Sequence, residues 1–340
     1  MRANEPPPLA DPRGRPLRDL RLSVTDRCNF RCRYCMPKEH FGPGFRFLPR
    51  ADLLRFEEMT RVARVFASLG VKKLRLTGGE PLLRSDLPDL VAQLAAIDGA
   101  ELALTTNGSL LEARADELVR AGLSRVTVSL DSLDEAIFRE MTDAALPPSK
   151  VIAGIEAAAR AGLRPVKINC VVRRGVNDAG IVDLARRFKG TGHIVRFIEL
   201  MDVGATNGWR MDQVMSGAEI VDTISRALPL EPASPTYRGE VAKRWRYTDG
   251  SGEIGVITSV TNPFCGDCSR ARLSAEGSVY TCLFATSGTD LRGPVRAGAT
   301  DEELAEIIRG IWSRRDDRYS ELRSDNTRSL RRIEMSYIGG

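Results

Sequence analysis

Six strand-like segments alternate with helical segments over the first two thirds of the chain, and this alternation constrains the fold most. The strand candidates are Leu20–Val24, Lys72–Leu76, Leu102–Thr105, Arg125–Leu130, Val166–Val172 and Val195–Leu200. Apolar spacing predicts helices at Asp52–Leu69, Leu111–Ala121, Val151–Ala161 and Ile181–Phe188. Gly70, Gly122 and Gly162 follow three of them, as C-terminal caps often do. Such a chain is expected to form a parallel sheet, either open or curved into an incomplete barrel.

Polar residues recur near the C-terminal ends of the predicted strands, namely Arg21, Ser23, Arg75, Thr77, Thr105, Ser129, Lys167 and Asn169. Buried parallel strands are normally almost continuous in apolar residues. One such residue can simply face solvent, but its recurrence in strand after strand indicates a shared wet cavity. Ligands of these folds bind at the C-terminal ends of the strands. The charges of Arg21, Arg75 and Lys167 make that cavity suitable for phosphate groups.

The strand–helix rhythm ends at about Met201. A helix at Ala218–Ala227, a connector at Pro229–Pro235, strands at Val241–Tyr247 and Ile254–Val260, and a helix at Asp301–Trp312 are expected to follow. We expect this part to form a small α+β layer over the barrel mouth. The predicted organisation is a flexible segment at 1–13, a partial barrel at 14–210 and a C-terminal region at 211–340.

The formal net charge is +5, from 50 basic and 45 acidic residues. This mild excess fits a small anionic ligand and gives no reason to expect a nucleic-acid partner. No run approaches the roughly 18 apolar residues of a membrane span, and the first residues lack the pattern of a signal peptide. The chain is therefore expected in the cytoplasm, with no membrane partner.

Cytoplasmic thiols stay reduced, so the seven cysteines need a role other than disulfide bonding. Cys170 stands alone in an apolar run and is expected in the core. The other six form two groups, which are Cys28, Cys32 and Cys35, and Cys265, Cys268 and Cys282. With two histidines in the chain, a histidine-rich metal site and a Ser-His-Asp triad are poor candidates.

The first group has the spacing C-x3-C-x2-C, and among nearby residues only His40 offers a fourth ligand. A tetrahedral zinc site usually needs four ligands. A four-iron cluster takes one thiolate per iron, so three cysteines leave one iron open. An open iron can bind S-adenosylmethionine, and one electron then cleaves it to a 5′-deoxyadenosyl radical. A three-cysteine zinc site remains the alternative.

The second group repeats this arrangement, because Cys265 and Cys268 are followed by Cys282 with no obvious fourth ligand. It indicates a second cluster whose open iron is free to hold a substrate atom, and a structural zinc site with a distant ligand is the alternative. Arg270 and Arg272 follow at once and could clamp a polyphosphate. Taken alone, that pair would be a solvated surface feature.

The run CNFRCRYC, which spans Cys28 to Cys35, resembles the signature of the radical S-adenosylmethionine (SAM) superfamily. TGGEP, from Thr77 to Pro81, resembles that superfamily's GGE motif. Together with FCGDCSRARLS, YTCLF and the terminal Gly-Gly, these motifs closely resemble the GTP 3′,8-cyclase family of molybdenum cofactor biosynthesis. The resemblance extends from about Gly14 to Gly340.

The resemblance implies an α/β fold, an incomplete (β/α)6 TIM-like barrel with a C-terminal layer that carries a second cluster. The two cysteine groups would hold two [4Fe–4S] clusters. It further implies SAM contacts at Tyr34, Gly79, Ser129 and Met201; GTP contacts at Arg21, Arg75, Thr105, Lys167, Arg270 and Arg272; and a catalytic tail at Gly339 and Gly340. The radical would remove the 3′ hydrogen of GTP, and C3′ would join C8 to give 3′,8-cyclo-7,8-dihydro-GTP.

The same resemblance implies a low-potential electron donor such as flavodoxin or ferredoxin and functional coupling to cyclic pyranopterin monophosphate synthase. It also allows a homodimer. Two other functions stay open at this point. One is a radical SAM enzyme with an auxiliary cluster that acts on a peptide, which would want a docking domain ahead of the barrel. The other is a zinc-stabilised binding protein.

Overall fold

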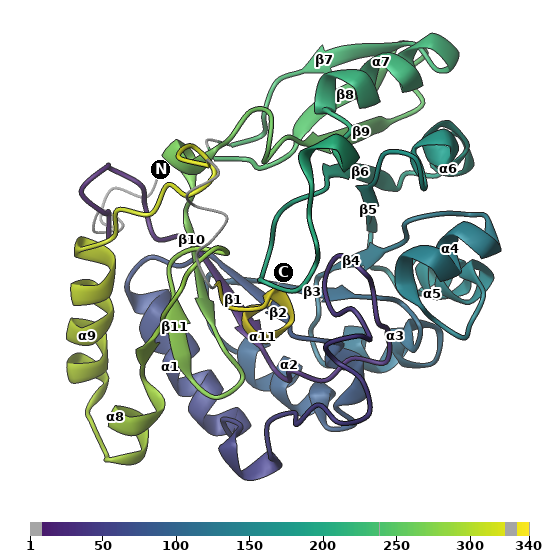
Figure 1. The fold of residues 1–340 in the computed structure, drawn as a ribbon. Coiled ribbons are helices and arrows are strands. Elements are labelled where there is room, and N and C mark those ends of the chain that lie inside the picture. The colour runs from purple at the N-terminus through teal and green to yellow at the C-terminus, as the bar shows by residue number, and fades with distance from the viewer. Residues whose placement is uncertain (1–8, 238, 324–331, 340) are drawn as a thin grey trace.

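The computed structural model describes residues 9–237, 239–323 and 332–339. Its strands form one open sheet in the order β12-β11-β10-β1-β2-β3-β4-β5-β6-β9-β8-β7. The centre is parallel, and each strand pairs with the next in the chain. The central strands are β1 (Asp19–Ser23), β2 (Lys73–Thr77), β3 (Glu101–Thr106), β4 (Arg125–Ser129), β5 (Lys167–Val172) and β6 (Ile194–Glu199). The predicted incomplete (β/α)6 barrel is confirmed (Figure 1).

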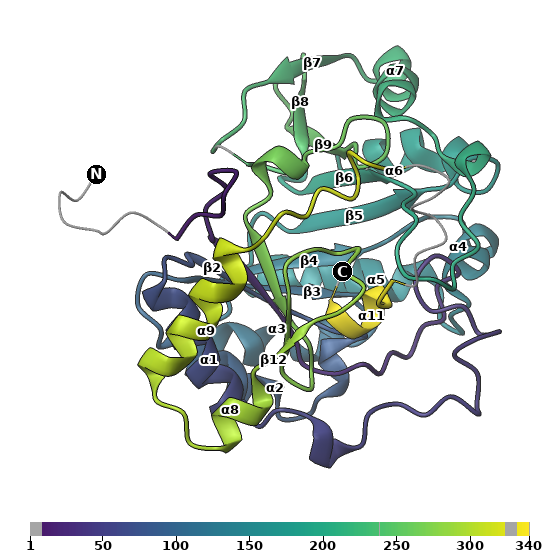
Figure 2. The same ribbon diagram turned by 60° about the vertical axis from the view of Figure 1, so that its left-hand side comes forward.

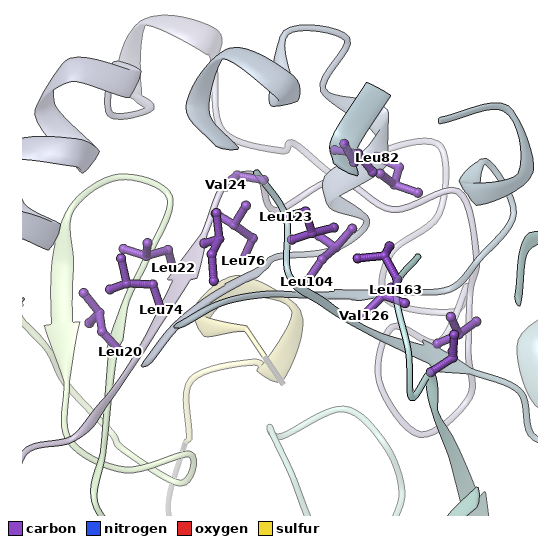
Figure 3. Packing of buried hydrophobic residues seen from close by; sticks show 14 of the residues in the cluster. Leu20, Leu22, Val24, Leu74, Leu76, Leu82, Leu104, Leu123, Val126 and Leu163 are labelled. Atoms are coloured by element: carbon purple, nitrogen blue, oxygen red, sulfur yellow. The ribbon is translucent and has the colours of Figure 1, made fainter. Parts of the chain in front are cut away.

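Apolar side chains alternate along the strands and separate two faces of the sheet. Leu20 and Leu22 of β1 and Leu74 and Leu76 of β2 are fully buried. Figure 3 shows them between the sheet and the outer helices, with the yellow C-terminal helix on the opposite side. Neighbouring residues in a strand point to opposite faces. The polar residues between these leucines therefore point to the inner face.

Helices cover the outer face of the central strands, and apolar residues at helical spacing, as in α1, fix their buried sides. The sequence did not predict the helices α2 (Leu87–Ala95) and α4 (Glu135–Thr142) in this part, nor α8 (Arg292–Arg296) and α11 (Met335–Ile338) in the C-terminal region. Helix α4 begins where Asp134 Oδ1 accepts a hydrogen bond from Ile137 N at 2.9 Å. Among the described residues, no helix is long and apolar enough to cross a membrane. The helices are α1 (Phe56–Ser68), α2 (Leu87–Ala95), α3 (Leu111–Arg120), α4 (Glu135–Thr142), α5 (Pro148–Arg160) and α6 (Ile181–Phe188).

The predicted glycine caps of the helices are confirmed, whereas the predicted start of the first helix is wrong. The three glycines expected as helix caps, Gly70, Gly122 and Gly162, all have positive φ values, of 106°, 104° and 104°. The first helix begins at Phe56 rather than at Asp52. Leu54 lies before the helix and is buried, and its N–H bonds to Ala275 O at 2.8 Å.

The C-terminal region extends the sheet at both edges. β9 adds parallel to β6 and continues through β8 to β7, whereas β10 adds parallel to β1 and continues through β11 to β12. This differs from the expected layer over the mouth, because the open barrel leaves β1 and β6 with unpaired edges that need partners. The elements are α7 (Gly217–Ala227), β7 (Leu230–Ala233), β8 (Lys243–Tyr247), β9 (Glu253–Ile257), β10 (Arg270–Leu273), β11 (Ser278–Tyr280), β12 (Thr289–Asp290), α8 (Arg292–Arg296), α9 (Asp301–Ser313) and α11 (Met335–Ile338).

The described residues at the start of the chain contact the rest of the protein. The Leu9 N–H bonds to Leu69 O at 3.4 Å, and Ala10 pairs with Pro16. Asp11 is buried and forms an ion pair with Arg15 at 2.5 Å. Residues 1–8 lie outside the described part of the chain.

Candidate active site

A cavity of about 340 Å³ lies on the inner face of the sheet, and all six central strands contribute to its wall. It brings together almost every residue that the sequence singled out. Gly339 lies beside it, and Gly340 is outside the described residues. The predicted residues in its wall are Arg21, Cys28, Cys32, Tyr34, Cys35, Arg75, Gly79, Thr105, Ser129, Lys167, Met201, Cys265, Cys268, Arg270, Arg272 and Cys282.

The first cysteine loop follows β1 and packs against the glycines after β2. Gly79 N donates to Thr25 O at 2.8 Å, and a Cβ on Gly79 would collide with Arg27 O. A Cβ on Gly78 would lie 2.5 Å from Thr25 O. The two glycines are thus needed for the close approach of two loops.

Glu80 fastens this pair of loops to the end of β3. The Glu80 side chain is 1% exposed. Its Oε1 accepts hydrogen bonds from Leu82 N at 2.9 Å and from Thr106 Oγ1 at 2.7 Å, and its Oε2 accepts one from Asn107 N at 2.7 Å. Burial raises the pKa of Glu80 to about 7. Asn107 in turn donates to Asn29 Oδ1 at 2.8 Å. These contacts fix the shape of the cysteine loop.

Tyr34, an expected SAM contact, donates from its hydroxyl to Asp131 Oδ2 at 2.8 Å. Asp131 is buried after β4, where it also accepts from Val171 N at 2.9 Å. Burial raises the pKa of Asp131 to about 6. The sequence did not single out Asp131, although it lies two residues beyond Ser129 on a predicted strand end.

Two buried arginines hold the second cysteine loop. Arg15 donates to Cys265 O at 3.0 Å, and Arg315 donates to Cys268 O at 2.6 Å. Both are paired with Asp11, at 2.5 and 3.5 Å. Sequence reasoning missed these arginines, because no local pattern marks a contact that spans 250 residues of chain.

The same loop is electrostatically unlike the first. Burial alone would raise the pKa of Cys268, but the charges of Arg270 and Arg315 lower it to about 6. Arg270 Nη2 lies 3.4 Å from Cys268 Sγ. Burial raises the pKa of Cys28 in the first loop to about 11, with a further contribution from Glu80.

Three arginines stand in register across three parallel strands. Arg272 on β10 pairs with Arg21 on β1, and Arg21 pairs with Arg75 on β2. Burial lowers the pKa of all three, and neighbouring arginines lower that of Arg21 and Arg272 further. Like charges directly opposite one another destabilise a sheet. Asp19 offsets part of this charge at Arg21 and Arg75, and the row remains suited to bind an anion.

The far side of the cavity adds more positive charge. Burial, with Arg196 as the next cause, lowers the pKa of Lys167 to about 7. Arg196 on β6 donates to Asn169 Oδ1 at 2.9 Å, and Arg75 donates to Thr105 Oγ1 at 3.1 Å. Arg196 was not among the predicted ligands, although the polar alternation of the other strands applies to its position as well.

The C-terminal tail reaches the arginine row. The Arg272 guanidinium donates to the carbonyl oxygen of Gly339. Gly339 has φ 75°, and a Cβ there would collide with Thr77 Oγ1. Earlier in the tail, Glu334 Oε1 accepts a hydrogen bond from Ala205 N at 3.0 Å, which anchors the segment before Gly339.

The donor sets fit four-iron clusters. All seven cysteines are free, and each triplet lines the cavity. Within the described ranges, no three or more His, Cys, Asp or Glu side chains converge closely enough to hold one metal ion. Each triplet offers three thiol ligands, as a four-iron cluster with one open iron requires.

Comparison with known families divides the chain into two matched parts. Residues 22–188 match the radical SAM superfamily, and residues 193–321 match the family described as Molybdenum Cofactor Synthesis C. The first match contains the first cysteine loop and the glycine motif. The second contains all three cysteines of the second group and Arg270 and Arg272.

Curated relatives align over nearly the full length of the chain. The GTP 3′,8-cyclase of Acidothermus cellulolyticus is 56% identical, over 98% of this chain and 99% of its own. Those of Xanthomonas campestris pv. campestris and Staphylococcus aureus are 51% and 49% identical, over 98% of this chain and 98% and 99% of theirs. The chain belongs to the GTP 3′,8-cyclase family. The predicted family is confirmed, and with it an enzyme that uses SAM and [4Fe–4S] clusters.

Solved structures support the fold of this family member. The structure of Streptococcus suis SuiB bound to S-adenosylmethionine has a TM-score of 0.61 at 14% identity, over 92% of this chain and 72% of that chain. A SuiB structure bound to its precursor peptide SuiA has the same score at 14% identity, over 96% of this chain and 71% of that chain. At such identity the likeness concerns the fold alone.

Proposed function

We propose that this protein converts GTP into 3′,8-cyclo-7,8-dihydro-GTP in the first step of molybdenum cofactor biosynthesis. The row of Arg272, Arg21 and Arg75 carries the proposal, because a buried run of like charges calls for a polyanion such as a triphosphate. Full-length similarity to GTP 3′,8-cyclases supports the nucleotide.

The two cysteine groups have separate roles in this proposal. Cys28, Cys32 and Cys35 would hold the cluster at which SAM binds, and Cys265, Cys268 and Cys282 would hold the second cluster. When bound, the first cluster and SAM supply the radical that removes the 3′ hydrogen of GTP. Tyr34, Gly79, Ser129 and Met201, which line the cavity, are the proposed SAM contacts.

The chain's own contribution is positioning and charge. The triphosphate is proposed to lie against Arg21, Arg75 and Arg272, with Arg270 toward the second cysteine loop and Lys167 on the far wall. Arg196, whose guanidinium is fixed by Asn169, joins this set. The first cysteine loop and the strand ends beneath it are held in place, because the buried carboxyl groups of Glu80 and Asp131 accept hydrogen bonds from neighbouring segments. Such fixed placement holds C3′ of the ribose near C8 of the base.

The tail is proposed to complete the wall beside the arginines. The Gly339 carbonyl oxygen accepts a hydrogen bond from the Arg272 guanidinium and so fixes the orientation of that side chain. Ile338 and Gly339 are buried, so the tail also excludes water from this side. Gly340 is assigned to the same function from the resemblance alone.

A low-potential donor such as flavodoxin or ferredoxin, coupling to cyclic pyranopterin monophosphate synthase and a cytoplasmic location complete the proposal. Each rests on the reaction that the family performs. Homodimer formation is proposed on the resemblance only.

The decisive experiment is anaerobic reconstitution followed by turnover with 3′-deuterated GTP and SAM. Deuterium in 5′-deoxyadenosine, together with a cyclised GTP product, is the expected result. Turnover that leaves all deuterium in the nucleotide would refute the proposed abstraction site. A reconstituted protein that binds zinc and cleaves no SAM would support the zinc-stabilised binding protein instead.

A further inference from the structure

The segment at 27–50, called the basic segment below, concentrates positive charge beside the first cysteine loop. Its excess of five positive charges equals the net charge of +5 of the whole chain. All of its basic residues except Arg31 are exposed. Its basic residues are Arg27, Arg31, Arg33, Lys38, Arg46 and Arg50, and its only acidic residue is Glu39.

The cysteine loop has a wall side and a solvent side. Cys28 and Cys32 line the cavity, whereas Arg27, Asn29 and Arg33, which adjoin them in sequence, are exposed. The exposed residues of the loop are therefore direct sequence neighbours of the cysteines that line the cavity. In Figure 2 the purple loop that continues from this part of the chain stands at the right-hand edge, remote from α9.

Arg31 fastens the outer part of the segment to the cysteine loop. Its Nη1 donates to Cys28 O and Phe30 O at 2.7 and 2.8 Å, and its Nε donates to Phe41 O at 2.8 Å. Its guanidinium also lies 5.7 Å from the ring centroid of Phe47. The surface and the loop thus form one fixed unit.

Aromatic rings lie within the charged surface. The centroids of Phe41 and Phe45 are 4.7 Å apart, and those of Phe45 and Phe47 are 4.8 Å apart. Phe45 is 41% exposed. An exposed aromatic side chain among arginines is the composition that recurs at the centre of protein–protein interfaces.

We propose that the basic segment is the docking surface for an acidic one-electron carrier protein. The inference rests on the proposed function, in which cleavage of SAM takes up one electron. The carrier loses one electron, and the cluster held by the first cysteine loop gains it. Opposite charge favours rapid docking of such a carrier. A nucleic acid also carries negative charge, but it cannot supply this electron.

The test uses the reconstituted full-length protein and an acidic flavodoxin as the probe. Arg46→Glu combined with Arg50→Glu reverses two exposed charges, and neither residue adjoins a cysteine. The matched control, Arg226→Glu combined with Arg309→Glu, makes the same charge change on α7 and α9. The Kd of the flavodoxin complex is measured by calorimetric titration at low and high salt.

We expect the Arg46/Arg50 variant to weaken flavodoxin binding about tenfold at low salt, with the difference shrinking at high salt. The control should stay within about twofold. Equal weakening in both variants, or none in the first, would overturn the proposal. Tighter binding of a 20-base-pair DNA duplex than of flavodoxin would also overturn it, because the surface would then be a nucleic-acid site.

A second readout separates this inference from the proposed function. With dithionite as reductant, both variants should cyclise GTP at the wild-type rate, whereas with reduced flavodoxin only the Arg46/Arg50 variant should slow. Phe45→Ala should weaken flavodoxin binding at low and high salt alike, and unchanged binding would remove the aromatic part of the surface. Failure of the wild type to cyclise GTP with dithionite would refute the proposed function, while the binding data would still test the docking surface.

Discussion

The two cysteine loops differ in the charges that surround one thiol of each, Cys28 and Cys268, whereas burial raises the pKa of Cys282 in the second group to about 12. The first lies among buried carboxyl groups, Glu80 and Asp131, and burial raises the pKa of Cys28 to about 11. The second is held by arginines, and Arg270 and Arg315 lower the pKa of Cys268 to about 6 against the effect of burial. Identical ligand chemistry is thus placed at one acidic and one basic part of the same cavity wall.

In the proposed function, this difference would favour a different small molecule beside each loop. SAM carries a sulfonium and an ammonium group, and buried carboxylates favour such positive charge. GTP carries a triphosphate, which the row of Arg272, Arg21 and Arg75 favours. In the proposed function, the charge beside each loop would therefore act together with the open iron of its cluster in selecting the molecule that binds there.

Removal of one thiolate from the first loop should have the largest effect. Cys35→Ala is expected to abolish SAM cleavage, because the cluster loses one of three ligands. The measurement is 5′-deoxyadenosine formed under anaerobic conditions with dithionite. Cys170→Ala is the matched control, since this thiol is buried in the core and should leave cleavage unchanged. Full cleavage by the Cys35 variant would remove the first loop from its assigned role.

Loss of Arg270 and Arg272 should act mainly on GTP binding, although Arg270 also contacts Cys268 and Arg272 the Gly339 carbonyl. Arg270→Ala with Arg272→Ala is expected to weaken GTP binding by roughly 10²–10³-fold, from two lost charge-assisted hydrogen bonds. Calorimetric titration measures the affinity, and iron content checks that both clusters remain. Arg186→Ala with Arg187→Ala on the exposed side of α6 should change neither. Wild-type affinity in the clamp variant would place the triphosphate elsewhere.

A methyl group on the tail should uncouple the two halves of the reaction. Gly339→Ala would collide with Thr77 Oγ1 and is expected to slow cyclisation about 10²-fold while SAM cleavage continues. Gly14→Ala is the matched control, because Gly14 also has positive φ, 73°, but has nothing within 4 Å of the added Cβ. Product analysis by chromatography measures both reactions. Equal losses in the two variants would reduce the effect to backbone strain.

Protonation of Lys167 should give the smallest effect. Burial, followed by the charge of Arg196, lowers its pKa to about 7, so its positive charge is lost as the pH rises through 7. Relative to Lys167→Gln, the wild-type affinity for GTP should fall about tenfold from pH 6 to pH 8. The ionisation of GTP is common to both proteins and cancels in the ratio. A ratio that is constant with pH would show that Lys167 does not meet the phosphates.

Much of the central fold and the cavity could be predicted from the sequence, because both depend on local periodicity. Alternation along each strand predicts that Arg21, Arg75 and Lys167 lie on the same face of the sheet. Because the strands run parallel, these side chains meet in one cavity wall. Arg196 follows the same rule and was overlooked. The C-terminal strands were harder, since pairing of β9 with β6 and of β10 with β1 is non-local and leaves no repeating pattern.

The supports of the site were least predictable. Arg15 and Arg315 hold the second cysteine loop from the two ends of the chain, and each is an ordinary arginine in sequence. Asp131 and Glu80 act through burial, which the local sequence does not report. The motifs therefore identify the reacting groups, and the three-dimensional structure identifies what holds them.

The most direct test of two loops with separate tasks is a pair of triple variants, each assayed for SAM cleavage and for GTP affinity. With Cys28, Cys32 and Cys35 changed to alanine, the protein should bind GTP and cleave no SAM. With Cys265, Cys268 and Cys282 changed to alanine, it should cleave SAM but bind GTP weakly and form no cyclised product. Iron analysis should show that each variant keeps its intact cluster. If both variants then lose the same activity, the two loops do not have separate tasks.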